Sequence, residues 1–302
     1  MVGLGKMGAN MTLRLTQHGQ QVVAWDRNEA SVKGVASEGA QGVASLEDLV
    51  KALDPPRAVW LMLPSGDPTE ATIHTLEDLL EPGDTIVDGG NSNFRFAMED
   101  AERLSAKGIA FIDAGVSGGV WGLKEGYCLM VGGKPDVVKR VEPIFEALAP
   151  ENGYAHVGPV GAGHFVKMVH NGIEYGLLQA YAEGFALMHK ADEFDLDLHQ
   201  IAELWRYGSV VRSWLLDLTA LALANEAEFG KVRGFVEDSG EGRWTVEEAI
   251  ARGVSTPVMA ISLFERFQSR EPDSFAAKIV AALRNQFGGH KFFEESAGAE
   301  AK

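Results

Sequence analysis

The sequence predicts an α/β domain over residues 1–160 with a doubly wound, mostly parallel sheet, followed by an all-helical domain over residues 161–302. In the first part, short apolar runs of strand length alternate with segments of helical pattern, which is typical of a sheet with helices on both faces. In the second part, apolar residues recur at helical spacing and the strand-like runs stop. The terminal stretch EESAGAEAK has almost no apolar content, and we predict that it is disordered.

The composition limits the classes of function. The chain has 302 residues with 46% hydrophobic content, which is enough to build the cores of two domains. Its formal net charge of −16 argues against general nucleic-acid binding, because that function needs a basic face. No apolar run is long enough to suggest a membrane span, and the glycine-rich start does not resemble a signal peptide. We therefore expect no nucleic-acid partner and no membrane segment.

Cys128 is the only cysteine of the chain. A disulfide within the chain is therefore impossible, and a reducing, cytoplasmic setting is expected. Within the stretch GYCLMVGG, Cys128 is predicted to be a buried strand residue rather than a nucleophile.

The start of the chain carries Gly3, Gly5 and Gly8 in the G-x-G-x-x-G spacing. A helical stretch follows, and then the strand-like QQVVAWDR, in which Asp26 is the acidic residue. This order is typical of a Rossmann-type dinucleotide-binding domain. Gly3 permits a tight turn, Gly5 lets the backbone approach a pyrophosphate, and Gly8 allows close packing of helix on strand. The helix N-terminus then holds the phosphates, and Asp26 accepts a hydrogen bond from a ribose hydroxyl.

The remaining elements follow from the pattern of apolar residues. Since only Met1 and Val2 precede the first glycine, either the first strand is very short or a few native N-terminal residues are missing. Later strands are predicted at residues 58–63, 84–92, 109–119, 127–133 and 154–161. Ligands of such sheets gather at the carboxyl ends of the strands, where Pro64-Ser65, Asn91-Ser92 and Ser117-Gly118-Gly119 lie. Helices of the second part are predicted at residues 163–191, 197–224, 246–252, 256–270 and 273–287, with a loop at 232–245.

The stretch KMVHNGIEYG places several polar side chains on one side of a predicted helix. At about 100° per residue, Lys167, His170, Asn171 and Glu174 share one face over two turns. Apolar neighbours suggest that much of this helix is buried. Buried charges are costly unless they are paired, so the pattern indicates either a structural network between helices or the wall of an active site. The stretch by itself leaves both interpretations open.

Taken together, the motifs resemble those of the 6-phosphogluconate dehydrogenase family in its short form, within the β-hydroxyacid dehydrogenases. They are GLGKMG (3–8), DGGNSN (88–93), GVSGGVWG (115–122), GAGHFVKMVHNGIEYG (161–176), GRWT (242–245) and RNQFGGH (284–290). The first of these is shared with the wider superfamily. His170, Glu174 and the RNQFGGH tail point to the narrower family.

The resemblance implies a decarboxylating oxidation of a 3-hydroxy acid. Hydride leaves C3 for the nicotinamide, the β-keto acid loses CO2, and the remaining enediol is protonated to a ketose phosphate. Lys167 is implied to be the base and Glu174 the acid, and a buried lysine can have the lowered pKa that this requires. His170 and Asn171 would orient the substrate, and Ser117 would bind its carboxylate with the glycines that follow.

The implied binding residues form two groups. Those for the dinucleotide are Gly3, Leu4, Gly5, Lys6, Met7, Gly8, Asp26, Arg27, Leu63, Pro64 and Asn91. Those for the substrate are Asn91, Ser117, Gly118, Gly119, His170, Asn171, Tyr175, Arg266, Arg284 and His290. Of these, Arg266, Arg284 and His290 are implied to bind the substrate's phosphate. Larger members carry a Lys and a Thr before the G-x-W-T motif, whereas this chain has Ser239 and Glu241, and Glu241 would repel a phosphate.

The expected cofactor is NAD. Asp26 repels a 2′-phosphate, so NADP is disfavoured, although Arg27 could support some use of it. No metal is expected, since no group of His, Cys, Asp and Glu has the spacing of metal ligands. The expected partners are 6-phosphogluconate and a second copy of the chain, in a homodimer or a dimer of dimers whose tails complete the neighbouring active site.

Two alternatives remain. A β-hydroxyacid dehydrogenase or semialdehyde reductase acting on a small acid without phosphate would leave Glu174 and the RNQFGGH tail unexplained. A non-catalytic dinucleotide-sensing module would leave the aligned polar face of the helix unexplained. The other histidines considered, namely His18, His74, His156, His189 and His199, are predicted to be surface residues or residues with satisfied hydrogen bonds.

Overall fold

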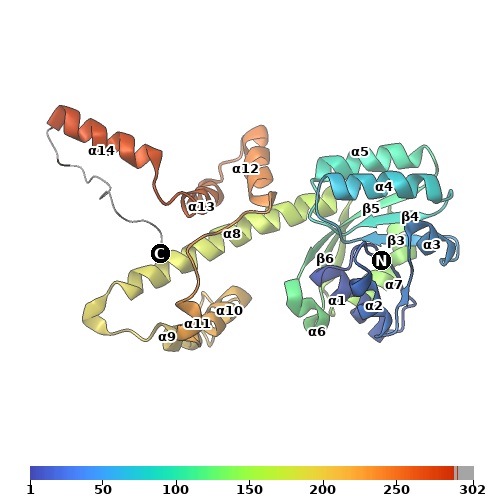
Figure 1. Ribbon diagram of the computed structural model, residues 1–302, viewed down its shortest axis with the longest axis horizontal. Coiled ribbons are helices and arrows are strands. Elements are labelled where there is room, and N and C mark those ends of the chain that lie inside the picture. The colour runs from blue at the N-terminus through green and yellow to red at the C-terminus, as the bar shows by residue number, and fades with distance from the viewer. Residues whose placement is uncertain (289–290, 292–302) are drawn as a thin grey trace. The chain divides into compact units, whose positions relative to one another are not determined.

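The computed structural model describes residues 1–288 and residue 291 (Figure 1). His290 and the tail predicted to be disordered lie outside these residues. The chain forms two compact units, of which the first contains Met1–Ile173 and Glu241–Glu248 and the second contains Glu174–Gly240 and the chain from Ala249 onward. The division at residues 160 and 161 stays a prediction.

The first unit is built on a five-stranded sheet with the strand order β3-β4-β5-β6-β7. These strands are β3 (Ala58–Leu61), β4 (Thr85–Asp88), β5 (Ala110–Ser117), β6 (Cys128–Gly132) and β7 (Tyr154–Gly158). All neighbours are parallel except β5 and β6, which are antiparallel. The register pairs Asp88 of β4 with Asp113 of β5, so two acidic residues lie side by side across these strands.

Val2 takes the place of the first strand. The short strands β1 (Val23–Ala24) and β2 (Gln41–Gly42) form a parallel pair of their own. Val2 makes one parallel bridge to Trp25, directly after β1, and another to Leu61 of β3. Val2 therefore links the two-stranded pair to the larger sheet.

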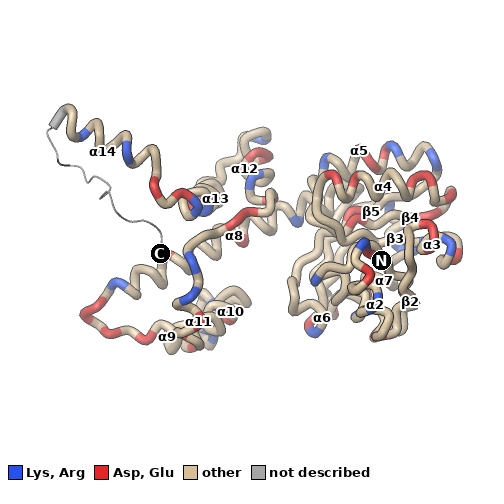
Figure 2. Tube along the Cα trace, viewed as in Figure 1, with Lys and Arg blue, Asp and Glu red and all other residues tan. Residues whose placement is uncertain are grey.

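Helices cover both faces of the sheet, which confirms the predicted doubly wound fold (Figure 1). They are α1 (Lys6–Gln17), α2 (Glu29–Ala36), α3 (Leu46–Lys51), α4 (Asp67–Leu79), α5 (Phe94–Ser105), α6 (Gly122–Glu125) and α7 (Pro135–Leu148), with a 3₁₀ turn at Gly119–Trp121. Trp60 and Val87 point into a core shared with α1 and α7, whereas their strand neighbours Val59 and Ile86 point into a core shared with α3, α4 and α5. This alternation follows from the two-residue period of a strand. Figure 2 shows acidic and basic residues interspersed along α4 and α5.

Among its described residues, the second unit has helices as its regular structure. The chain enters it along α8 (Ala162–His189), followed by a 3₁₀ turn at Asp192–Phe194 and by α9 (Leu198–Trp205), α10 (Trp214–Leu223), α11 (Glu226–Phe229), α12 (Glu241–Arg252), α13 (Pro257–Gln268) and α14 (Phe275–Gly288). The first residues of α8 and of α12 belong to the first unit. In the part of the chain that the structure describes, no helix has the length and apolar character needed to span a membrane.

Three local predictions were wrong. The helix predicted at 197–224 is two helices, because Gly208 adopts a φ of +73° and Ser213 caps α10 by accepting from the backbone N–H of Leu216. The loop predicted at 232–245 ends early, since α12 begins at Glu241 and includes the GRWT motif. Cys128 is a strand residue as predicted, but its side chain is exposed at the start of β6.

Candidate active site

The glycine-rich turn before α1 has the geometry that its spacing predicts. Gly3 has a φ of +88°, and a Cβ there would lie 2.5 Å from the carbonyl oxygen of Met62. A Cβ on Gly8 would lie 2.0 Å from the carbonyl oxygen of Gly3, so the helix packs directly on the turn. At Gly5, by contrast, a Cβ would meet nothing within 4 Å. A ligand can therefore approach the backbone at Gly5.

The start of α1 is suited to an anion. The helix begins at Lys6, its first turn contains no acidic residue, and no side chain among the described residues caps it. Its first N–H groups and the positive end of its dipole can thus serve a phosphate. Lys6 and Gly5 are exposed, Met7 is half-buried, and Leu4 is buried.

Asp26 lies against this turn. Its Oδ2 accepts a hydrogen bond from the backbone N–H of Leu4 at 2.6 Å, and its Oδ1 accepts from Asn28 at 2.7 Å. Arg27 is exposed. On the other side of the turn, Leu63 Cδ2 lies 2.8 Å from where a Cβ of Gly3 would be, and Pro64 follows at the surface. These residues fit a dinucleotide whose ribose meets the Asp26 carboxylate.

The first turns of α8 pack very closely on β5 and β6. A Cβ on Gly115 would lie 2.5 Å from Lys167 Cβ, and a Cβ on Gly163 would lie 2.4 Å from the carbonyl oxygen of Asp113. Asp113 also holds the start of the helix, because its Oδ1 accepts from the N–H of Gly161 at 2.7 Å and its Oδ2 accepts from the N–H of His164 at 2.8 Å. The glycines of two separate motifs therefore allow Lys167 to lie directly over β5.

A row of hydrogen bonds joins the predicted residues at this place. Lys167 Nζ donates to Asn171 Oδ1 at 2.8 Å, and His170 Nδ1 lies 3.2 Å from the same oxygen. His170 Nε2 lies 3.3 Å from Ser117 Oγ, at the carboxyl end of β5. Because an amide oxygen only accepts, His170 must donate from Nδ1, and in the neutral ring Nε2 then accepts from the Ser117 hydroxyl. Lys167 is 7% exposed and Asn171 8%, whereas His170 and Ser117 are half-buried, so the end of the row that carries the amine is the part shielded from water.

Much of this helix is buried, as its apolar neighbours suggested, since Met168 is 3% exposed and Tyr175 6%. Val166 and Ile173 are exceptions, at 37% and 49% exposure. Glu174 is half-buried and lies about two turns after Lys167 on α8. Asn91 is exposed in the turn after β4, and Gly118 and Gly119 follow β5 directly.

The structure brings Tyr175 and Arg266 together in the second unit. The Arg266 guanidinium carbon lies 3.4 Å from the centre of the Tyr175 ring, and its NH1 donates to the carbonyl oxygen of Glu237 at 2.9 Å. Arg266 is thus held in place rather than extended into water. The hydroxyl of Tyr175 is buried and has no hydrogen-bond partner among the described residues.

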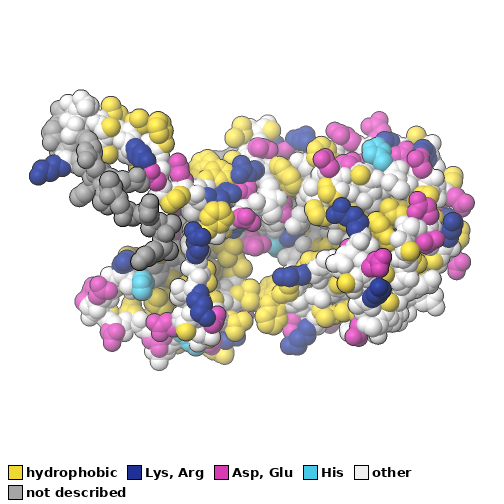
Figure 3. Space-filling model, in the orientation of Figure 1, with side chains coloured by type: hydrophobic (Ala, Val, Ile, Leu, Met, Phe, Trp, Pro, Cys, Tyr) yellow, Lys and Arg dark blue, Asp and Glu magenta, His cyan; other side chains and the backbone are white. Residues whose placement is uncertain are grey.

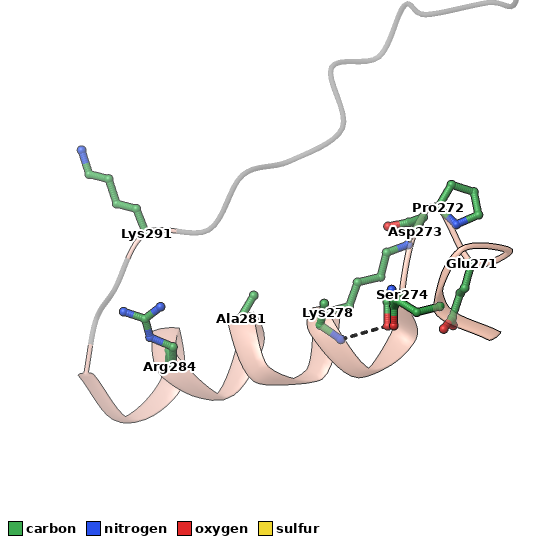
Figure 4. A pocket seen from close by; sticks show the side chains of 10 residues that line it. Glu271, Pro272, Asp273, Ser274, Lys278, Ala281, Arg284 and Lys291 are labelled. Atoms are coloured by element: carbon green, nitrogen blue, oxygen red, sulfur yellow. Dashed lines mark hydrogen bonds and ion pairs between the residues drawn. The ribbon is translucent and has the colours of Figure 1, made fainter. Parts of the chain in front are cut away.

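Arg284 lies on α14, beside a pocket of about 530 Å³ that Lys278, Ala281 and Lys291 also line. Figure 4 shows Arg284, Ala281 and Lys278 on one side of this helix, with Lys278 paired to Asp273. His290 lies outside the described residues, so the structure does not place it beside Arg284.

The GRWT motif meets α8 through Thr245. Its hydroxyl is 2.8 Å from the carbonyl oxygen of Met168, the neighbour of Lys167, and 2.8 Å from that of Glu241. Glu241 itself is 2% exposed in the first turn of α12. The motif therefore supports the helix that carries Lys167.

Comparisons with known proteins agree with this geometry. Residues 1–158 match the model of the NAD binding domain of 6-phosphogluconate dehydrogenase, and residues 163–277 match that of the 6-phosphogluconate dehydrogenase C-terminal domain. The chain belongs to the 6-phosphogluconate dehydrogenase family.

Individual relatives are similar over nearly the whole of this chain. YqeC of Bacillus subtilis, provisionally named a 6-phosphogluconate dehydrogenase, is 43% identical over 96% of this chain and 97% of its own. The NAD(+)-dependent, decarboxylating 6-phosphogluconate dehydrogenase of Haloferax volcanii is 42% identical over the same shares. The 6-phosphogluconate dehydrogenase of Plasmodium falciparum, solved with NADP+ and with 6-phosphogluconate, has a TM-score of 0.82 at 27% identity, over 98% of this chain and 66% of its own.

Three buried residues of this family member were not singled out from the sequence. They are Asp88 and Asp113, at 2% and 0% exposure, and His164, at 1%. The sequence pattern that could have identified them is an acidic residue within each of two apolar strands, together with a histidine one turn before Lys167. Within the described part of the chain, no group of three or more His, Cys, Asp and Glu side chains could hold a metal ion.

Proposed function

We propose that this chain oxidises and decarboxylates 6-phosphogluconate to ribulose 5-phosphate and CO2, with NAD as the hydride acceptor. The observation that supports this most directly is the hydrogen-bonded row from Lys167 through Asn171 and His170 to Ser117. It places a buried amine, an imidazole and a hydroxyl at the carboxyl end of β5, where ligands of doubly wound sheets bind. Membership of the family supplies the substrate class.

Lys167 is the proposed base. The neutral amine takes the proton of the C3 hydroxyl as the hydride leaves C3. A nicotinamide dinucleotide held at the glycine-rich turn would supply the hydride acceptor. The resulting ammonium polarises the C3 ketone, so that the electron pair of the bond to the leaving CO2 can move onto the substrate. Lys167 then returns its proton to the C3 oxygen, which leaves an enediol. Its hydrogen bond to Asn171 holds the amine in place throughout.

The other polar groups bind and orient the substrate. Ser117 and the N–H groups of Gly118 and Gly119 bind the carboxylate before it leaves. His170 and Asn171 hold the substrate hydroxyls, and Asn91 lies between nicotinamide and substrate. Arg266, stacked on Tyr175, binds the phosphate, as do Arg284 and His290.

One assay tests this function. The purified chain is incubated with 6-phosphogluconate and NAD, and the absorbance of the reduced cofactor is followed together with released CO2. We expect both products in equal amounts. Reduction of NAD without CO2, or activity only with a small 3-hydroxy acid that lacks a phosphate, would overturn the proposal.

Glu174 is the proposed acid, which protonates the enediol at the carbon that carried the carboxylate. Glu174→Gln keeps the size of the side chain but has no acidic proton, so we expect kcat to fall by about 100-fold. Protonation should become the slow step, and the solvent isotope effect on kcat in D2O should therefore rise. An unchanged kcat with an unchanged isotope effect would show that another group supplies the proton.

NAD is the proposed cofactor because Asp26 lies against the glycine-rich turn, where a 2′-phosphate would meet its carboxylate. We expect kcat/KM for NAD to exceed that for NADP by about tenfold or more. Asp26→Asn should narrow this ratio, and Arg27→Ala should widen it by removing the nearby cation. A tenfold preference of the unmodified chain for NADP would contradict the assignment.

We also propose that the chain forms a homodimer, or a dimer of such dimers, in which each tail completes the neighbour's active site. The support is the apolar surface of the second unit, where Figure 3 shows hydrophobic side chains gathered over α13. Val258, Ile261 and Phe264 of this helix are 54–65% exposed. A further apolar pocket of about 580 Å³ lies between α8 and α10 and is lined by Tyr181, Phe185 and Leu218. Surfaces of this kind are typical of contacts between subunits, and a second copy of the chain is the occupant that we propose.

A further inference from the structure

His164 lies between two buried carboxylates in the first unit. Its Nε2 is 3.2 Å from Asp88 Oδ2, and its backbone N–H donates to Asp113 Oδ2 at 2.8 Å. Asp88 and Asp113 lie side by side, because they are register partners on the neighbouring strands β4 and β5. Both strands therefore hold the first turn of α8 at His164, and Asp113 of β5 also holds it at Gly161.

Asp88 also holds the turn that carries Asn91. Its Oδ1 accepts from the backbone N–H of Gly90 at 2.9 Å, while its Oδ2 faces the His164 ring. A single carboxylate thus connects the Gly89-Gly90-Asn91 turn with the helix that carries Lys167, one turn after His164. In the proposed reaction these two segments contribute the base and a residue between nicotinamide and substrate.

The charges favour this arrangement. Burial lowers the pKa of His164, but the hydrogen bond with Asp88 and the charges of Asp88 and Asp113 outweigh it, so this pKa lies above its ordinary value of 6.5. For Asp88, burial raises the pKa of the carboxyl group, but its hydrogen bonds with His164 and with the N–H of Gly90 lower this pKa by more. The pKa of Asp88 therefore lies below its ordinary value of 3.8. The two carboxylates carry one more charge than the His164 cation, and the positive end of the α8 dipole faces this excess negative charge. The charged forms of both groups are therefore stabilised.

We propose that Asp88 and His164 are positioning residues, which fix the Lys167 amine relative to the turn that carries Asn91. This inference rests on the proposed function, because it concerns the geometry of that reaction. A buried ion pair is a weak source of net stability. Correct placement has a larger effect, since a displacement of about 1 Å can lower the rate about 100-fold.

The test uses a matched pair of substitutions at the two ends of β4. His164→Leu removes the cation beside Asp88, and Arg57→Met removes the cation beside Asp84, with which Arg57 makes a 2.9 Å ion pair. Asp84 is 1% exposed and directly precedes β4. Each substitution leaves one buried carboxylate without its cation, but only the first lies near Lys167.

We expect both variants to unfold at lower temperature, because both leave a buried charge without its cation. Only His164→Leu should lower kcat, by about 100-fold with KM within about threefold, since the lost geometry matters in the transition state. His164→Gln keeps a neutral hydrogen-bond donor, and its kcat should fall by about tenfold. This variant also provides the test if His164→Leu does not fold. A wild-type kcat in either His164 variant, or an equal loss in Arg57→Met, would overturn the proposal.

A second measurement does not depend on the substrate. In protein labelled with ¹³C-lysine, the Cε signal of Lys167 is assigned by its absence in Lys167→Met. It should shift in His164→Leu and stay in place in Arg57→Met. If the wild-type chain does not act on 6-phosphogluconate, the proposed function fails while this shift still supports the positioning. If the signal does not move, the positioning is wrong whatever the substrate.

Discussion

Lys167→Met is expected to abolish oxidation of 6-phosphogluconate while leaving dinucleotide binding intact. The amine is the proposed base for the C3 hydroxyl and then the cation at the C3 ketone, and methionine can do neither. General acid–base catalysis contributes about 100- to 10,000-fold, and loss of the cation adds to this, so we expect kcat to fall by at least about 1,000-fold. The measurement is kcat with NAD, together with NAD affinity from the quenching of tryptophan fluorescence.

The fold should tolerate this substitution. Lys167 is 7% exposed, and its stem lies over Gly115, so an unbranched apolar side chain of similar length fits the same space. Lys139→Met is a suitable control, because Lys139 is exposed on α7 and pairs only with Glu142 among the ion pairs of the described residues. It should keep wild-type activity. If Lys167→Met kept turnover near the wild-type value, the proposed mechanism would be wrong.

Two inactive variants are expected to restore activity when they are mixed. Lys167→Ala removes the base, and Arg284→Ala removes a proposed phosphate ligand that acts on the neighbouring subunit. When the two are unfolded, mixed and refolded together, about half of the dimers contain one copy of each. If tails act across the interface, one site of each mixed dimer combines an intact Lys167 with an intact Arg284. About a quarter of all sites, and hence of the wild-type activity, should therefore return.

The same experiment has an outcome that would contradict the shared active site. If each tail served its own subunit, every site of a mixed dimer would keep one lesion, and the mixture would stay as inactive as its components. Subunit exchange must be shown separately, for instance with an affinity tag on one variant that retains the other. Refolded Lys167→Ala by itself is the control for spontaneous recovery. A mixture that exchanges subunits but remains inactive rules out the shared site.

The residues brought together by local spacing could be predicted from the sequence. The turn at Gly3, the close packing at Gly8 and the acidic residue after the second strand-like segment all follow from short-range geometry, and the structure has them as expected. The same holds for Lys167 and Asn171, which are four residues apart and therefore neighbours on one helix face. Periodicity also indicated where the sheet ends and the helices take over.

The tertiary structure alone decided which of these segments meet. Asp88 and His164 are 76 positions apart in the chain, and Ser117 and His170 are 53 apart, so no local pattern could pair them. The break between α9 and α10 and the helical start of the GRWT motif likewise depend on caps and on contacts such as that of Thr245 with α8. Spacing along the chain fixes which side chains share a face, because helices and strands have set periods. Which faces then pack together depends on close contacts such as Gly115 against Lys167 and on buried charges that find partners, and these exist only once the strands and α8 have come together.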